Sequence, residues 1–144
     1  MNLYYKANTL AVINRETLEL EDEIVFAGEL LNINEKDGKV YAVSDKGLYE
    51  VDFAGKTYIP KLKFDDCVDS HSYYVYDDYF LDGKCYVFLR HDKVSNGNRN
   101  EYGDMLKIDM DTLEVESSTP ISCSKNTYLE NIFILPASYM RENE

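Results

Sequence analysis

The chain is poor in the segments that mark several large protein classes. No apolar run approaches the roughly 20 residues that a membrane-spanning helix needs, and residues 1–5 lack the basic region and apolar segment of a secretory signal. The three cysteines, Cys67, Cys85 and Cys123, are odd in number and far apart, which favours free thiols in a reducing compartment over a disulfide framework. We therefore expect a cytoplasmic protein with no membrane partner.

Catalytic signatures are missing as well. The sequence contains no Gly-x-Ser-x-Gly elbow, no phosphate-binding Gly-rich loop and no His-Glu-x-x-His pair. His71 and His91 are the only histidines, and among 27 carboxylates closeness in sequence does not identify an acid–base pair. The sequence therefore predicts no catalytic residue and no cofactor.

Positive charge is scarce, with 15 Lys and Arg side chains against 27 Asp and Glu, so the net charge is −12. A surface of this sign repels phosphate backbones and anionic lipid, which disfavours direct nucleic-acid binding. The same charge keeps a protein soluble and attracts a basic protein partner. Charge alone does not decide between these two roles.

Tryptophan is absent, whereas 13 Tyr and 6 Phe are present, and this aromatic content favours strands. Hydrophobic residues make up 44% and charged residues 29% of the 144 residues, as in ordinary globular proteins. A chain of this length fits one domain. We expect a single all-β domain over residues 1–144.

A short motif occurs twice. Asp37-Gly38-Lys39 is followed by Val40 and Tyr41, and the same pattern returns from residue 82 as Asp-Gly-Lys followed by Cys and Tyr. Asp-Gly between alternating apolar residues is the strongest short hairpin signal, because it supplies two positive φ angles. A repeat with this spacing indicates stacked copies of one supersecondary unit.

A second feature occurs three times. Apolar strands that end at Ile13, Val51 and Ile108 are each followed by a polar stop that begins with Asn14, Asp52 or Asp109. An Asn or Asp side chain at the first turn position can accept a hydrogen bond from the backbone two residues further on. We interpret the three stops as hairpin tips rather than as ligand sites.

Together these turns predict two complete four-stranded antiparallel units. One has strands at about 29–36, 39–44, 47–53 and 57–64, and the next has strands at about 73–81, 84–91, 104–109 and 113–121. Residues 3–7, 9–14 and 18–26 match the second, third and fourth strands of an earlier unit that lacks its first strand. Such units resemble the blades of a β-propeller.

The resemblance implies about three blades, in repeats of about 1–26, 27–64 and 65–122, with an extra strand at 126–135. Propeller rings typically have about four to eight blades. We therefore expect two chains to form a homodimeric six-bladed ring, with the extra strand completing the first blade. A fragment of a longer propeller and a curled open sheet are the alternatives.

Antiparallel order predicts which connections share a face. The short turns lie at one end of the strands, while segments 65–72 and 91–104 lie at the other, and the second of these replaces a much shorter link. Long loops are often functional. The candidate binding residues in these two loops are Asp65, Asp66, Asp69, His71, His91, Asn98, Arg99 and Tyr102.

Two residue clusters near these loops need separate interpretations. Acidic residues surround Cys67, but they lack the alternation of a calcium loop and the paired Cys or His ligands of a zinc site, so no metal site is predicted. Segment 73–80 holds four Tyr residues and one Phe. Strand packing accounts for most of them, and an exposed subset would suit a protein partner.

Three classes of function follow. The first is a non-catalytic protein-binding module or scaffold that uses segments 65–72 and 91–104. The second is an acidic decoy or inhibitor of a basic or nucleic-acid-binding partner. The third, implied by the propeller resemblance, is an enzyme with a pocket on the ring axis.

Overall fold

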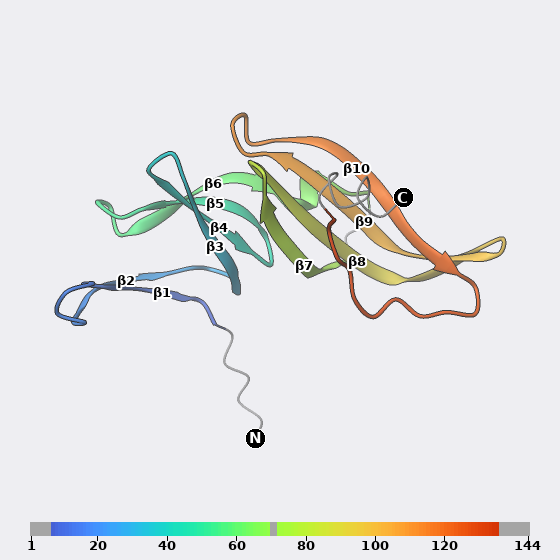
Figure 1. Ribbon diagram of the computed structural model, residues 1–144, viewed down its shortest axis with the longest axis horizontal. Coiled ribbons are helices and arrows are strands. Elements are labelled where there is room, and N and C mark those ends of the chain that lie inside the picture. Colours follow the sequence, from blue (N-terminus) through green and yellow to red (C-terminus); the bar gives the residue numbers. More distant parts are fainter. Residues whose placement is uncertain (1–6, 70–71, 136–144) are drawn as a thin grey trace, which may run out of the picture.

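The computed structural model describes residues 7–69 and 72–135, which form an all-β structure with antiparallel sheets (Figure 1). No helix within these ranges has the length and apolarity needed to cross a bilayer. One 3-10 turn, η1 (Phe64–Asp66), separates the last two sheets. The strands are β1 (Thr9–Ile13), β2 (Leu20–Val25), β3 (Leu30–Lys36), β4 (Lys39–Ser44), β5 (Gly47–Asp52), β6 (Thr57–Lys63), β7 (Tyr74–Leu81), β8 (Lys84–Asn96), β9 (Arg99–Asp109) and β10 (Glu114–Ser124).

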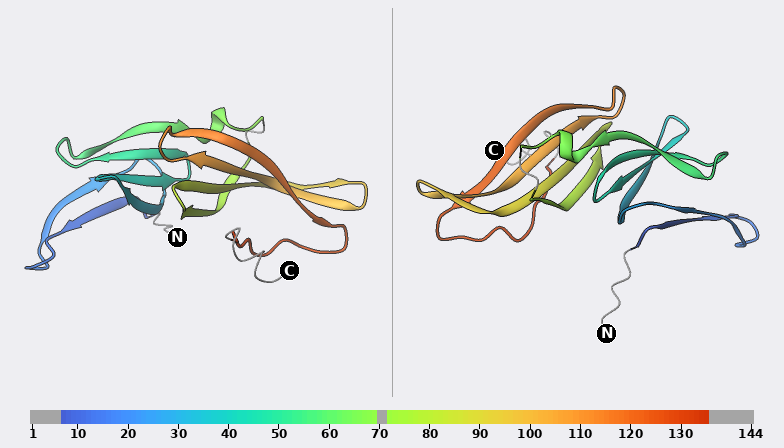
Figure 2. Two further views of the ribbon diagram at one scale, coloured as in Figure 1. Left: turned by 45° about the horizontal axis from the view of Figure 1, so that its top comes forward. Right: turned by 180° about the vertical axis from the view of Figure 1, so that it is seen from behind.

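Strands that follow one another in the sequence are neighbours in the same sheet. The sheets have the orders β1-β2, β3-β4-β5-β6 and β7-β8-β9-β10. Two four-stranded antiparallel units therefore exist, and their bounds are close to those expected from the sequence except in β8 and β9. Figures 1 and 2 show the sheets side by side in an open arrangement, and residues 7–69 and 72–135 form no closed barrel or propeller.

The hairpin tips have the predicted chemistry. Asp37 and Gly38 have φ angles of 53° and 79°, and the equivalent Asp82 and Gly83 have 52° and 73°. Two positive φ angles in a two-residue turn match the twist of the flanking strands. The Asp-Gly pairs are therefore hairpin turns, as the sequence predicts.

The three polar stops adopt one common turn. In each, the side-chain oxygen of Asn14, Asp52 or Asp109 accepts hydrogen bonds from backbone N–H groups two or three residues further on. The residue four positions after each has a positive φ, namely 60° at Leu18, 54° at Lys56 and 59° at Leu113. The interpretation of these residues as turn formers is confirmed.

The prediction of a loop at 91–104 is wrong. β8 and β9 continue through it to a two-residue turn at Gly97 and Asn98, with Asn96 paired to Arg99. The ladder shifts between Arg90 and Val94, and β10 stays paired with β9 as far as Arg99, so the hairpin end extends the sheet. Polar residues form strands here because most of their side chains are exposed. We refer to residues 91–104 as the outer ribbon.

The predicted extra strand at 126–135 is also wrong. Residues Asn126–Leu135 form no strand and instead cross one face of the β7–β10 sheet (Figure 2). Side chains of the sheet, rather than a neighbouring strand, hydrogen-bond to the backbone of this segment. We call it the C-terminal strap. The predicted strand at 3–7 lies outside the described residues except for Ala7.

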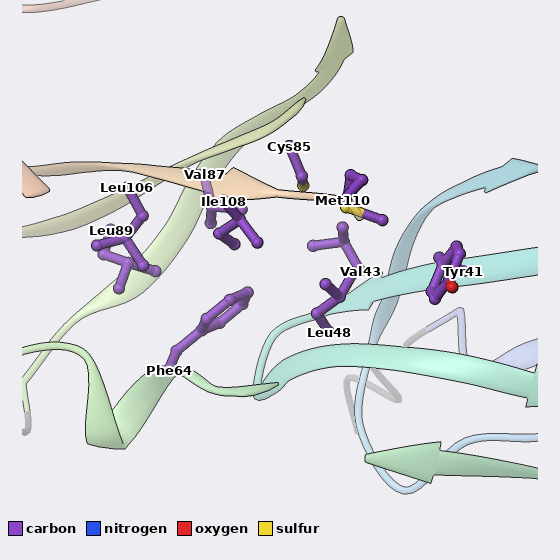
Figure 3. Packing of buried hydrophobic residues seen from close by; sticks show 10 residues of the cluster. All are labelled: Tyr41, Val43, Leu48, Phe64, Cys85, Val87, Leu89, Leu106, Ile108 and Met110. Carbon is purple, nitrogen blue, oxygen red and sulfur yellow. The ribbon is translucent and has the colours of Figure 1, made fainter. Parts of the chain in front are cut away.

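Three apolar layers hold the sheets and the strap together. The largest lies between the β3–β6 and β7–β10 sheets, where Phe64 at the start of η1 points toward Val87 and Ile108, with Leu48 close by (Figure 3). A second layer joins the β1–β2 hairpin to the β3–β6 sheet through Ile24 and Phe26. The third lies beneath the strap.

Candidate functional site

The two segments predicted to share a face meet around an open hollow of about 410 Å³. Segment 65–72 before β7, which we call the link, contributes Ser72 to one wall. The outer ribbon contributes His91 and Asp92 to the other. A neighbouring hollow of about 260 Å³ extends along the ribbon to Val94. The larger hollow is lined by Ser72, Tyr73, Tyr74, His91 and Asp92.

His91 is held by the ribbon itself. Its Nδ1–H donates to the carbonyl oxygen of Asp92 at 2.7 Å, and its Nε2 lies 3.5 Å from Oε1 of Glu101. These contacts fix the orientation of the imidazole ring on the wall of the hollow. His71, the other histidine, lies outside the described residues.

The acidic link packs against the core between the sheets through Cys67 and Val68. Asp65 accepts a hydrogen bond of 2.7 Å from the hydroxyl of Tyr73, and burial together with this bond raises the pKa of Tyr73. Asp66 and Asp69 are exposed. Within residues 7–69 and 72–135 no group of His, Cys, Asp and Glu side chains is arranged to hold a metal ion.

The remaining predicted residues anchor the outer ribbon. The carbonyl of Asn98 accepts a bond of 2.9 Å from the N–H of Lys125. Arg99 donates to the hydroxyl and the carbonyl of Ser122 at 2.8 and 2.7 Å. Tyr102 is buried and donates to the carbonyl of Thr127 at 2.8 Å. These residues therefore support the ribbon, and Tyr102 is not accessible to a partner.

Tyr74 at the larger hollow and Val94 at the neighbouring one are exposed apolar groups, each 54% exposed. Neither was among the residues selected from the sequence. The dense run of tyrosines at 73–79 was the available signal for Tyr74, but strand alternation could not show which tyrosine faces solvent. Val94 was hidden within a segment that the sequence suggested was a loop.

The opposite end of the sheets has a smaller hollow of about 210 Å³, lined in part by Lys36 and Lys84. Each lysine is neutralised: Lys36 pairs with Asp37 and Asp111, and Lys84 pairs with Asp109 and Glu116. The Lys36–Asp111 pair joins β3 to the turn before β10. This end is closed by short turns and ion pairs, so we place the candidate site at the ribbon end.

Asp78 on β7 is a carboxylate in an unfavourable position. Its Oδ2 is buried with no hydrogen-bond partner among the described residues. Burial raises the pKa of Asp78, a hydrogen bond from Asn32 lowers it, and the charge of Asp77 raises it further, with a net increase above 3.8. The ionised form is therefore disfavoured in the folded state.

We expect Asp78→Asn to raise the free energy of unfolding at neutral pH by about 1 kcal/mol, a modest effect because the side chain is partly exposed and screened. Because the folded-state pKa of Asp78 is raised, ionisation of Asp78 destabilises the native fold. The free energy of unfolding of the native chain therefore falls as pH rises from 3.8 through the folded-state pKa. The gain should thus vanish below pH 3.8. Urea denaturation across this pH range tests it, with the exposed Asp82→Asn as control; equal stability of Asp78→Asn and the native chain at neutral pH would contradict it.

No family model, no curated protein and no solved structure matches the chain.

Proposed function

We propose that this chain is a non-catalytic protein-binding module that presents the hollow between the link and the outer ribbon to another protein. The observation that carries the proposal is the position of Tyr74 and Val94, two exposed apolar side chains that line neighbouring hollows with Ser72, His91 and Asp92 in common. Tyrosine is enriched at protein interfaces because it combines a large apolar ring with a polar hydroxyl.

The surroundings of the hollow suit a protein partner. The ribbon is fixed to β10 by Arg99 and to the segment after it by Asn98, so little ordering is needed on binding. The hollow is open and shallow, and its polar groups, His91 and Asp92, lie beside the exposed apolar ones. An apolar centre with polar groups around it is the usual arrangement of a protein interface.

The test places a photo-cross-linking amino acid at position 74 or 94, with position 53 as control because Phe53 is exposed at the other end of the strands. We expect one partner to be captured from positions 74 and 94 and not from position 53. The captured protein is then purified. Tyr74→Ala should weaken its affinity at least about tenfold, and Phe53→Ala should leave it unchanged. Equal affinity for both variants would refute the proposal.

The net charge of −12 supports a second candidate, an acidic decoy for a basic partner. The same purified partner distinguishes the two. Binding through long-range charge weakens steeply as salt is added, whereas binding anchored by Tyr74 and Val94 changes little. Strong salt dependence with an unaffected Tyr74→Ala variant would favour the decoy.

Whether two copies of this chain assemble into a ring is a separate question. A head-to-tail six-bladed ring would need a sheet of the second chain to pack where the strap now lies on the β7–β10 sheet. A molar mass equal to that of two chains would support the ring. A molar mass equal to that of one chain would exclude it.

A further inference from the structure

The strap covers a largely aromatic surface on the β7–β10 sheet, on the face turned away from the β3–β6 sheet. We call the part of this surface beneath the strap the groove. Leu129, Ile132 and Ile134 of the strap are half-buried against this groove. The floor is formed by Phe88, Tyr102 and Met105, with further contacts from Tyr76, Tyr86, Ile121 and Cys123. The strap thus fills the place where another sheet would pack in a repeating stack.

The polar contacts of the strap are made to its main chain. Tyr102 donates to the carbonyl of Thr127 at 2.8 Å, and the guanidinium of Arg90 donates to the carbonyl of Leu129 at 3.2 Å. The hydroxyls of Tyr76 and Tyr79 reach the carbonyls of Glu130 and Ile132. Four side chains of the sheet therefore bind four carbonyls of an extended segment.

Arg90 is built into the groove. Its guanidinium lies 4.6 Å from the ring centre of Tyr76 and 5.3 Å from that of Tyr102, an arrangement that orients the cation between two aromatic faces. A guanidinium fixed in this way keeps its N–H groups directed at the strap with little loss of side-chain entropy on binding. The donors are therefore in place whether or not the strap occupies the groove.

These contacts can be made by a different segment. Main-chain carbonyls are common to every peptide, so the groove selects mainly through its apolar contacts, at the spacing of Leu129, Ile132 and Ile134. The strap forms no strand ladder with the sheet. Its two largest side chains face solvent, with Tyr128 81% and Phe133 77% exposed.

We propose that this groove is a peptide-binding site which the strap occupies within its own chain. The partner is a protein with an extended segment that carries apolar side chains at its first, fourth and sixth positions, as residues 129, 132 and 134 do in the strap. Such a segment displaces the strap and takes over its carbonyl contacts. This inference concerns a different surface from the hollow, and it holds or fails independently of the proposed function.

The test uses the full chain with the strap released by Leu129→Asp and Ile132→Asp. The probe is a fluorescein-labelled synthetic peptide with the sequence of residues 126–135, and binding is measured by fluorescence anisotropy. We expect saturable binding to the released variant, and binding at least about tenfold weaker to the native chain, because its own strap competes at high effective concentration. Adding Arg90→Leu to the released variant should abolish binding.

Matched controls come from the strap itself. Tyr128→Asp and Phe133→Asp introduce the same charge at exposed positions, so this variant should keep its strap and bind the peptide as weakly as the native chain. A peptide with Asp in place of Leu129 and Ile132 should not bind the released variant. Equal binding of both peptides, or no binding of the native sequence, overturns the proposal.

A measurement on the native chain covers the case in which the released variant does not fold. Limited proteolysis of the native chain should cut the strap far more readily than β8 and β9, because a protease needs a segment that leaves the sheet. A strap that is cut only at the rate of global unfolding would overturn the proposal. So would a native dimer that disappears in the released variant, because the occupant would then be the strap of a second copy.

Discussion

Replacing Gly103 by alanine is expected to lower the free energy of unfolding by about 3 kcal/mol, although the change adds a single methyl group. A Cβ at this position would stand 2.1 Å from the carbonyl oxygen of Leu89 and 2.8 Å from the Cα of Arg90. Both are backbone atoms of the neighbouring strand β8. They cannot move away without breaking the ladder between β8 and β9.

The position of Gly103 explains why the whole ribbon depends on it. It pairs with Arg90 on one side and Ile121 on the other, and both ladders shift register immediately beyond this point. The next residue toward the ribbon tip, Tyr102, lies beneath the strap. Loss of the close approach at Gly103 should therefore disturb the hollow and the strap together.

Chemical denaturation followed by circular dichroism measures the effect. Gly97→Ala is the matched control, because it adds the same methyl group at the ribbon tip, where φ is 60° and no atom lies within 4 Å. Its expected cost is about 1 kcal/mol, from the left-handed backbone alone. Similar losses for the two variants would show that the close approach at Gly103 does not matter.

The fold was predictable wherever a turn has a strict local requirement. The Asp-Gly tip at residue 37 fixes the register of β3 and β4, and the polar stop at Asp109 does the same for β9 and β10. Each rests on contacts within a few residues of the sequence, so the pattern of residue types is enough to identify it.

The outer ribbon and the strap were not predictable, because their structures are set by pairing and packing that the pattern of residue types does not show. The ribbon has polar residues on both faces, a pattern that suits a loop as well as a strand. The pairing of residues 94–96 with 99–101, and of 99–101 with β10, shows that it is a strand. The strap has strand-like alternation of apolar residues. Its partners, such as Arg90 and Tyr79, lie dozens of residues earlier in the chain.

The position of the two segments at one end of the sheets was predictable, but of the selected residues that the structure describes only His91 lines the hollow. Antiparallel order alone places the link before β7 and the outer ribbon at the same end of the sheets, and the hollow between them agrees with this. Individual side chains were not predictable, because exposure depends on tertiary packing. Tyr102 was selected as a binding residue and is buried, while Tyr74 is exposed.

Phe64→Ala is expected to cost about 4 kcal/mol, the other large loss that the structure predicts. The Phe64 side chain is fully buried between the two four-stranded sheets, in one cluster with Leu48 and Val87 (Figure 3). It comes from η1 rather than from either sheet. Its removal therefore leaves a cavity at the contact between the sheets and keeps every strand ladder intact.

Phe53→Ala removes the same ring from an exposed position, the turn between β5 and β6, and should change stability by no more than about 0.5 kcal/mol. Urea denaturation of the two variants compares them directly, and Phe64→Leu should recover part of the loss because it refills part of the cavity. The cavity in Phe64→Ala lies between two sheets that each stay folded. We therefore also expect the urea unfolding transition of this variant to broaden, because the two sheets no longer unfold together. A sharp transition with a loss as small as that of Phe53→Ala would mean that the β3–β6 and β7–β10 sheets do not depend on Phe64 for their contact.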